Sequence, residues 1–360
     1  MLIRPCYHYS VRIEAIKIKG AKPVNLTGLI ADDVVNLVES EHFTWIDIEI
    51  TDSTDDAALG KLLIGRLDFH PATVSDCLRH EGFHQPKMDE EQDYRFVTFI
   101  YYEPQADGKL KRLELYSYVG TTYVITIHNH SCKKLMDEIR DFPRVITDYE
   151  QRAILFMHHV LDMVVDTYTP LLRSFGHRAD DLEISVLKAS KKRKRKTRGL
   201  STLIRKTSKI SDMREILKMR RSLVHLRRTL TEEEEIVDRL VEEYDYEGAP
   251  EASEEIAIYF RDISDHLGKY LEIIEGLDSS LNHLMEVHAL LTGQRTNEII
   301  FLLTIISTIM LPLNLIVGFF GMNFDNLWFS HVSWGIWIVT GFMFAIVAGL
   351  FFYFRNKGWI

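Results

Sequence analysis

The stretch "IIFLLTIISTIMLPLNLIVGFF" (residues 299–320) decides the fold, because it has 22 residues and no charged side chain. A second stretch, "WGIWIVTGFMFAIVAGLFFYF" (residues 334–354), has 21 residues and is also free of charge. A helix needs about 20 apolar residues to cross the hydrocarbon core of a bilayer. The alternative is a pair of buried core helices, but uninterrupted apolar runs of this length are rare in soluble proteins. We therefore expect two C-terminal transmembrane helices.

The distribution of Lys and Arg predicts how these helices are oriented. Arg295 precedes the first apolar run, Arg355 and Lys357 follow the second, and residues 321–333 between them carry neither Lys nor Arg. Positive charge is retained on the cytosolic side. We expect both termini in the cytosol of a multi-pass protein of the cell's inner (plasma) membrane. Because two helices cannot enclose a hydrated pathway, transport would require several copies around an axis; a simple membrane anchor is the alternative.

The remaining sequence predicts a large cytosolic part. β-Branched and aromatic segments alternate with helical patterns up to about residue 150, which is typical of an α/β domain, and helical periodicity follows. The expected organisation is an α/β domain over 1–150, a helical hairpin over 151–251, a single helix over 252–320, an outer loop over 321–333, and a second membrane helix with a cytosolic tail over 334–360. That single helix would be about 100 Å long at 1.5 Å per residue.

Composition and motifs exclude several functions. The net charge of −9 argues against nucleic acid as the main partner. The chain has no GxGxxG or GxxxxGK[ST] fingerprint, so we expect no organic cofactor. It also lacks a recognisable nucleophile and base, and we do not expect an enzyme.

The residues around the first apolar run resemble a known family. "TNEIIFLLTIISTIMLPLNLIVGFFGMNF" (residues 296–324) ends in Gly321-Met322-Asn323 and is followed by one last apolar helix. This arrangement looks like the CorA family of magnesium channels, and "HPATVSDCL" and "FRDISDHLGKYLEIIE" resemble the family's cytosolic domain. The resemblance implies an α+β membrane protein: a cytosolic α/β/α domain, a long stalk helix continuous with the first membrane helix, and a funnel-shaped homopentamer.

The family pattern is departed from at three places. The loop after the motif reads "FDNLWFSH", which leaves Asp325 as its only carboxylate at the outer mouth. Asn314 stands where a pore threonine is often found, and the tail "RNKGWI" lacks a run of Lys. These departures concern the residues that would attract cations to the outer mouth more than the Gly-Met-Asn motif that would select them.

The chemistry of Mg²⁺ suggests what the pore residues do. This ion dehydrates reluctantly, so amide oxygens that bind its water shell can select it without trapping it. By the resemblance, Gly321, Met322 and Asn323 form the selectivity filter, with Gly321 turning the backbone and Met322 packing. Residues at steps of three or four can share one face of the first membrane helix: Asn297, Ile300, Leu303, Ser307, Leu311, Asn314 and Gly318. Helix-packing hydroxyls remain the alternative for Ser307 and Thr304.

The resemblance also implies regulation by divalent cations bound between cytosolic subunits. Asp76 and Glu286 match the family's first regulatory pair. Asp262, together with Asp166, matches a second regulatory site, for which the resemblance is weaker. Mg²⁺ would then be both cargo and regulator. Solvated surface carboxylates are the alternative at all four positions.

Two further segments of the cytosolic part carry runs of like charge. "KASKKRKRKTRG" (residues 188–199) is basic, and "TEEEEIVDRLVEEYDYEG" (residues 231–248) is acidic with one Arg. Solvated helix ends explain both. The alternative for Lys191–Lys196 is binding of anionic lipid headgroups, to which each basic residue contributes about 1 kcal/mol.

We therefore expect a divalent cation channel or transporter, chiefly for Mg²⁺ uptake with possible passage of Co²⁺ or Ni²⁺. The membrane potential would supply about 4.6 kcal/mol per divalent ion at 100 mV. A zinc, nickel or cobalt transporter on the same scaffold, in some cases proton-coupled, is the second interpretation. A non-conducting membrane-anchored sensor is the third.

Overall fold

The computed structural model describes residues 12–19, 22–50, 56–78, 85–104, 110–129, 133–139, 152–194, 208–246, 249–322 and 334–358. The chain forms two compact units, Met1–Leu284 and Met285–Ile360.

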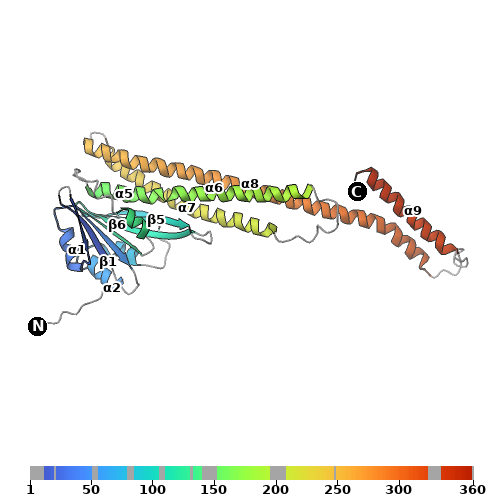
Figure 1. Ribbon diagram of the computed structural model, residues 1–360, viewed down its shortest axis with the longest axis horizontal. Helices are drawn as coiled ribbons and strands as arrows, with labels where there is room; N and C mark the ends of the chain where they lie inside the picture. The colour runs from blue at the N-terminus through green and yellow to red at the C-terminus, as the bar shows by residue number, and fades with distance from the viewer. Residues whose placement is uncertain are drawn as a thin grey trace. The chain divides into compact units, whose positions relative to one another are not determined.

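A seven-stranded mixed sheet forms the centre of the N-terminal unit (Figure 1). Its strands lie in the order β2 (Lys22–Thr27), β1 (Arg12–Lys19), β3 (Thr44–Ile50), β7 (Tyr123–Asn129), β6 (Leu110–Val119), β5 (Arg95–Pro104) and β4 (Lys87–Glu90). The β3–β7 pair is parallel, and the other pairs are antiparallel. Strands β6 and β7 are joined by a turn at Gly120. An added Cβ at this position would meet the ring of Tyr123 at 2.3 Å.

Short helices cover one face of the sheet. These are α1 (Ala31–Val38), α2 (Asp56–Leu63) and α3 (Pro71–Leu78). Alternate strand residues such as Ile46, Ile48 and Ile125 point into this layer and are fully or nearly fully buried. The ring of Phe69 stacks on that of Tyr118 with centroids 4.2 Å apart, which ties the entry of α3 to the sheet.

A second set of helices covers the other face. α4 (Lys133–Ile139) and α5 (Arg152–Asp166) come first, followed by α6 (Tyr168–Lys194) and α7 (Ser208–Tyr244). α5 buries nine apolar residues, and its Phe156 lies 5.0 Å from the Trp45 ring of β3. The opposite strand face therefore also has a core, and the predicted α/β/α domain is confirmed.

The last two helices contain the apolar runs. α8 (Glu251–Phe320) has 70 residues, and α9 (Gly335–Asn356) has 22. Both are long and apolar enough to cross a membrane, and each apolar window is only 6% buried. The predicted long helix that leads into a second apolar helix is confirmed. Pro312 lies inside α8, which continues to Phe320.

Candidate ion pathway and cation sites

One face of the membrane segment of α8 is exposed along its whole length. All seven residues predicted to line a pore lie on it: Asn297, Ile300, Leu303, Ser307, Leu311, Asn314 and Gly318. The apolar members are the most notable, because Ile300, Leu303 and Leu311 are 55%, 62% and 72% exposed. Within the described residues, the chain does not cover this stripe.

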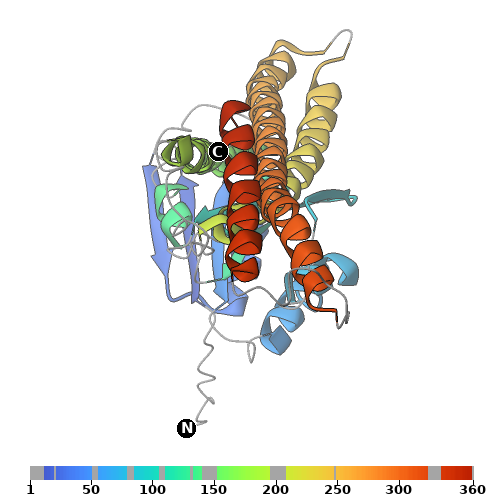
Figure 2. The same ribbon diagram turned by 90° about the vertical axis from the view of Figure 1, so that its right-hand side faces the viewer.

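The opposite face of the same helix is covered. Ile305 is 6% exposed, and Ile309, Pro312 and Ile316 are partly buried. At 3.6 residues per turn these positions lie roughly half a turn away from the stripe. In α9, Val339, Met343, Leu350 and Phe354 form a matching buried or half-buried face. Figure 2 shows α9 running beside the C-terminal part of α8.

Two threonines of this segment are satisfied by their own helix. Thr304 donates its hydroxyl hydrogen to the Ile300 carbonyl, and Thr308 donates to the Thr304 carbonyl, both at 2.8 Å. This favours a helix-internal role for the Thr304 hydroxyl, which was the alternative interpretation of that residue. The amides of Asn297 and Asn314 are the strongest polar candidates on the stripe.

The Gly-Met-Asn motif begins at the C-terminus of α8. The Gly321 N–H donates to the Val317 carbonyl at 2.8 Å, and a Cβ at position 321 would approach the same oxygen to 3.0 Å. This close approach is a local reason for glycine. Met322 is 54% exposed, and the packing of its side chain stays a prediction. Asn323 and Asp325 lie outside the described residues.

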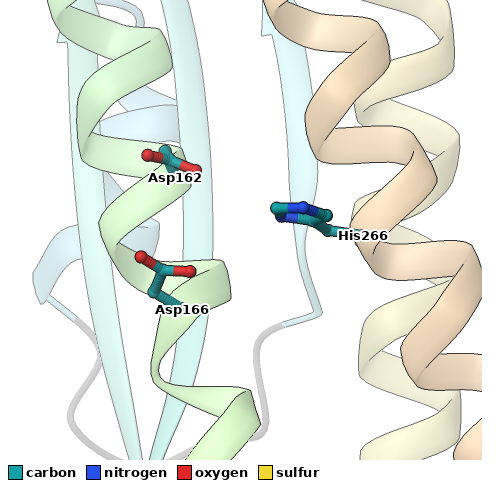
Figure 3. Close-up of side chains that lie close together, drawn as sticks. All are labelled: Asp162, Asp166 and His266. Carbon is teal, nitrogen blue, oxygen red and sulfur yellow. The ribbon is translucent and has the colours of Figure 1, made fainter.

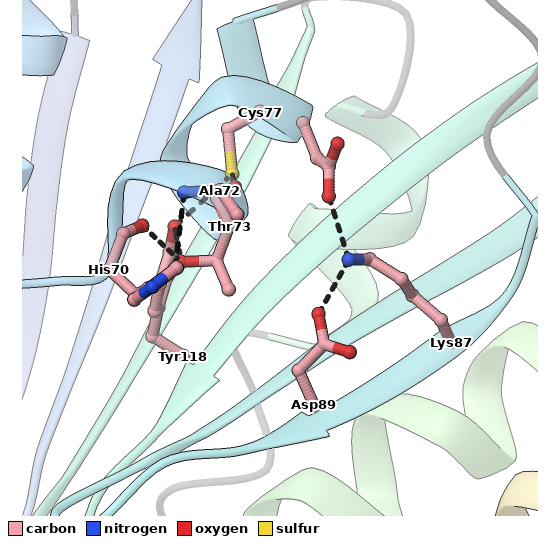
Figure 4. A network of polar contacts seen from close by, with 8 residues as sticks. His70, Ala72, Thr73, Cys77, Lys87, Asp89 and Tyr118 are labelled. Atoms are coloured by element: carbon pink, nitrogen blue, oxygen red, sulfur yellow. Dashed lines mark hydrogen bonds and ion pairs between the residues drawn. The ribbon is translucent and has the colours of Figure 1, made fainter.

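Asp76 lies on α3 beside a lysine. The Lys87 ammonium is 2.7 Å from Oδ2 of Asp76 and 2.5 Å from Oδ2 of Asp89, as the dashed lines in Figure 4 show. Burial lowers the pKa of Lys87, but the two carboxylates outweigh it and the pKa is raised. A cation at Asp76 would therefore compete with an ammonium group that is already bound.

The same close-up shows how α3 is held. The Thr73 hydroxyl donates to the His70 carbonyl at 2.9 Å, and the Tyr118 hydroxyl donates to Thr73 Oγ1 at 3.3 Å. Cys77 lies 3.6 Å from the Tyr118 oxygen, and burial raises the pKa of its thiol to about 12. Cys77 is thus an inert core residue that fixes the helix carrying Asp76.

A second group of cation-binding side chains lies between α5 and α8. Asp162, Asp166 and His266 each offer a ligand atom, and these atoms lie within 4.8 Å of one another (Figure 3). Nδ1 of His266 is buried and has no hydrogen-bond partner. The two carboxylates come from α5 at a spacing of four residues, which places them on one face. We call these three residues the α5–α8 cluster.

The electrostatics of the α5–α8 cluster favour a bound cation. Burial raises the pKa of Asp162, and the carboxylates of Asp166 and Asp262 raise it further, whereas His266 lowers it. A divalent ion would remove the repulsion between these carboxylates. Two carboxylates and an imidazole suit a borderline ion such as Co²⁺, Ni²⁺ or Zn²⁺, and Mg²⁺ would use the carboxylates alone.

The predicted regulatory residues are distributed as follows. Asp166 belongs to the cluster, and Asp262 lies one turn before His266 on α8 and is exposed. Glu286 is exposed and belongs to the C-terminal unit, whereas Asp76 belongs to the N-terminal unit. Their pairing stays a prediction. The sequence analysis did not single out Asp162 and His266; the i, i+4 spacings of Asp162 with Asp166 and of Asp262 with His266 were the available signal.

These features define a class of protein: a membrane transport protein with a folded α/β/α domain and two membrane helices, one of which exposes a stripe of amides. The family described as "CorA-like Mg2+ transporter protein" matches residues 40–356, and the chain belongs to this family. Members of this family are transporters or channels and not enzymes.

Individual relatives agree with this assignment. YfjQ of Bacillus subtilis, a candidate metal ion transporter by its name, is 31% identical over 88% of this chain and 89% of its own. The cobalt/magnesium transport protein CorA of Thermotoga maritima is 26% identical over 91% of this chain and 87% of its own. The complete structure of the CorA magnesium transporter from Methanocaldococcus jannaschii superposes with a TM-score of 0.72 at 20% identity, covering 96% of this chain and 98% of that one.

Proposed function

We propose that this protein is a channel for divalent cations, chiefly Mg²⁺, that conducts the hydrated ion down the membrane potential. One observation carries this proposal: α8 exposes a stripe with two amides, whereas residues on the opposite side of the same helix are buried or half-buried. Neither apolar run contains Asp, Glu, Lys, Arg or His. A neutral stripe can bind the water shell of an ion and then release it.

Several copies of the chain are needed to turn the stripe into a pathway. Exposed Leu303 and Leu311 would face one another around a central axis, where apolar rings close a pore by excluding water. We propose a homopentamer with both termini in the cytosol, in accordance with the family resemblance and the Lys and Arg distribution. In this assembly Asn323 would form a ring of amides at the outer mouth, and Asp325 would supply its charge.

Cytosolic cation binding is the proposed brake on this channel. The α5–α8 cluster offers one site, and Asp76 with Glu286 of a neighbouring copy offers another. Ions bound at these positions would stabilise the closed arrangement when cytosolic Mg²⁺ is high. The basic segment Lys191–Lys196 would contact anionic lipid headgroups.

Flux into proteoliposomes tests the conduction proposal. Vesicles that contain the full chain should take up Mg²⁺ when the interior is made negative with a potassium gradient and valinomycin. The uptake should not depend on an imposed pH gradient. Matched vesicles without protein are the control. Absence of Mg²⁺ flux under a potential would contradict the proposal and favour a non-conducting sensor.

A zinc, cobalt or nickel transporter is the second candidate, because the α5–α8 cluster contains an imidazole. The same vesicles distinguish the two candidates. Preferential Zn²⁺ uptake that requires an inward proton gradient would favour the second candidate, and potential-driven Mg²⁺ uptake without a proton requirement would exclude it.

A further inference from the structure

Glu233 is a buried carboxyl group in an acidic segment whose other described carboxylates are partly or fully exposed. It lies on α7 and is 1% exposed, although its neighbours in the run Glu232–Glu235 reach solvent. The backbone N–H of Ile100 on β5 donates to Oε1 of Glu233 at 3.2 Å. The expectation that this acidic run is a solvated helix end is therefore wrong at Glu233.

The second carboxyl oxygen of Glu233 contacts a tyrosine that has another acceptor. The Tyr168 hydroxyl oxygen, at the start of α6, lies 2.8 Å from Oε2 of Glu233 and 2.5 Å from the carbonyl oxygen of Ile100. A tyrosine hydroxyl carries one hydrogen, and a carbonyl carries none. If Tyr168 donates to the carbonyl, its contact with Glu233 requires a hydrogen on the carboxyl group. If Tyr168 instead donates to Glu233, two lone-pair oxygens face each other at 2.5 Å.

Among the residues that the structure describes, the polar groups around Glu233 do not provide a counterion dedicated to it. Tyr102, two residues along β5, shares a hydrogen bond of 2.9 Å with Thr229, one turn earlier on α7. Arg112 on β6 is paired with Glu114 at 2.5 Å, and Glu232 is paired with Arg228 at 3.1 Å. The charge of Arg112 favours an ionised Glu233, whereas Glu232 opposes it. A fully buried carboxylate in this position would be costly to keep ionised.

We propose that Glu233 is held protonated in the folded protein and acts as a proton-dependent latch that joins α6 and α7 to strand β5. Its carboxyl hydrogen is donated to Tyr168, the Tyr168 hydrogen is donated to the Ile100 carbonyl, and the Ile100 N–H is donated back to Glu233. This closed ring of hydrogen bonds satisfies each of the three groups. Loss of the proton leaves two acceptors in contact and a buried negative charge, which loosens the helices from the sheet.

The electrostatics agree with this geometry and give the direction of the pH dependence. Burial is the main cause that raises the pKa of Glu233 from 4.5 to about 8, against smaller opposing contributions from Tyr168, Ile100 and Arg112. Between these two values the folded protein binds more protons at this site than the unfolded chain. Stability from Glu233 is therefore greatest below about pH 4.5, falls as the pH rises, and is lost once the pH passes about 8.

The substitution Glu233→Gln tests the proposal because glutamine copies the protonated form. Its amide oxygen can accept from the Ile100 N–H, and its amide nitrogen can donate to Tyr168. We expect the full chain in detergent to unfold at the same temperature as wild type near pH 4, where Glu233 is protonated in both the folded and the unfolded chain. At pH 9 the variant should unfold about 3 °C or more above wild type. Glu235→Gln, an exposed position on the same helix, should follow wild type at both pH values.

A variant that is destabilised equally at both pH values would overturn the proposal, since an ionised Glu233 accepts hydrogen bonds from both Ile100 and Tyr168, and the amide nitrogen of glutamine cannot accept the second. An infrared difference spectrum provides a second readout that does not depend on reversible unfolding. Near pH 7 the wild-type spectrum minus the Glu233→Gln spectrum should contain the C=O stretching band of a protonated carboxylic acid. A carboxylate band in its place would equally overturn the proposal.

Discussion

Polar side chains have opposite surroundings at Glu233 and on the α8 stripe. Around Glu233, Tyr168 and the Ile100 backbone contribute hydrogen-bonding atoms within 3.2 Å, and the carboxyl group is 1% exposed. On the stripe, Asn297 and Asn314 are exposed, and the neighbouring Leu303 and Leu311 are more than half exposed. The first site is ionisable and enclosed within one chain; the second is neutral and open.

This difference indicates where the polar groups of each site find their hydrogen-bond partners. A buried polar group must find partners within the fold, because an unsatisfied one costs about 1–3 kcal/mol. An exposed amide in an apolar helix has the same requirement in a membrane, where water is absent from the lipid. Under the proposed function, the stripe finds these partners outside the single chain, in other copies and in the hydrated ion. Substitutions should reduce stability at the enclosed site and transport at the open site.

The largest expected effect is on transport, from Asn314→Leu. Leucine removes an amide that contacts the ion's water shell and extends the apolar ring of Leu311, so the pore should exclude water over a longer distance. We expect Mg²⁺ flux into vesicles to fall at least about tenfold, with little change in the unfolding temperature. Flux under a fixed membrane potential is the measurement.

Thr308→Val is the matched control for that experiment. Thr308 lies off the stripe, and its hydroxyl already donates to the Thr304 carbonyl at 2.8 Å. Its replacement should leave flux within about twofold of wild type, because an exposed helix-internal hydrogen bond contributes little. Equal losses in both variants would show that the stripe is not the pathway.

The two sites also differ in how much the sequence reveals. The long helix was predicted to begin at residue 252, and it begins at Glu251. Its length was predictable because no proline interrupts the sequence pattern before Pro312. The stripe follows from helical spacing alone. Strands β2 and β4 give only weak signals in the sequence, because they are short and contain Lys22, Pro23 or Lys87, which disrupt an alternating apolar pattern.

Long-range contacts explain what the sequence could not predict. Glu233 appears within four consecutive glutamates, and only the fold shows which of them faces Ile100 and Tyr168, which lie 133 and 65 residues away along the chain. In the same way, Asp162 and His266 come from helices α5 and α8, which meet only after folding. Sequence periodicity describes one helix or strand at a time, so it cannot predict sites that are assembled from two or three elements.

An intermediate effect is expected at the enclosed site, from Tyr168→Phe. Phenylalanine removes the hydroxyl that contacts both the Ile100 carbonyl and Glu233, which leaves two buried polar groups short of a partner. We expect a loss of about 1–3 kcal/mol in stability across the pH range. The comparison is Tyr270→Phe, whose hydroxyl pairs with Thr169 at 2.7 Å in a partly buried position and should cost less. Denaturant unfolding in detergent measures both, and a larger loss for Tyr270→Phe would contradict the comparison.

The smallest expected effect is on cation affinity, from Asp166→Asn in the α5–α8 cluster. Asp166 is exposed, so water already screens its charge, and one exposed charge pair at 4 Å contributes about 1 kcal/mol. The Co²⁺ concentration that gives half-maximal thermal stabilisation should rise roughly fivefold. Asp265→Asn, at an exposed carboxylate on α8 outside the cluster, should change this Co²⁺ concentration by less than about twofold.

His266→Gln sharpens the result, since loss of the imidazole should weaken Co²⁺ binding, whereas binding of Mg²⁺, which favours oxygen ligands, should be affected less. Equal weakening of both ions would mean that His266 orients the carboxylates and does not bind the metal.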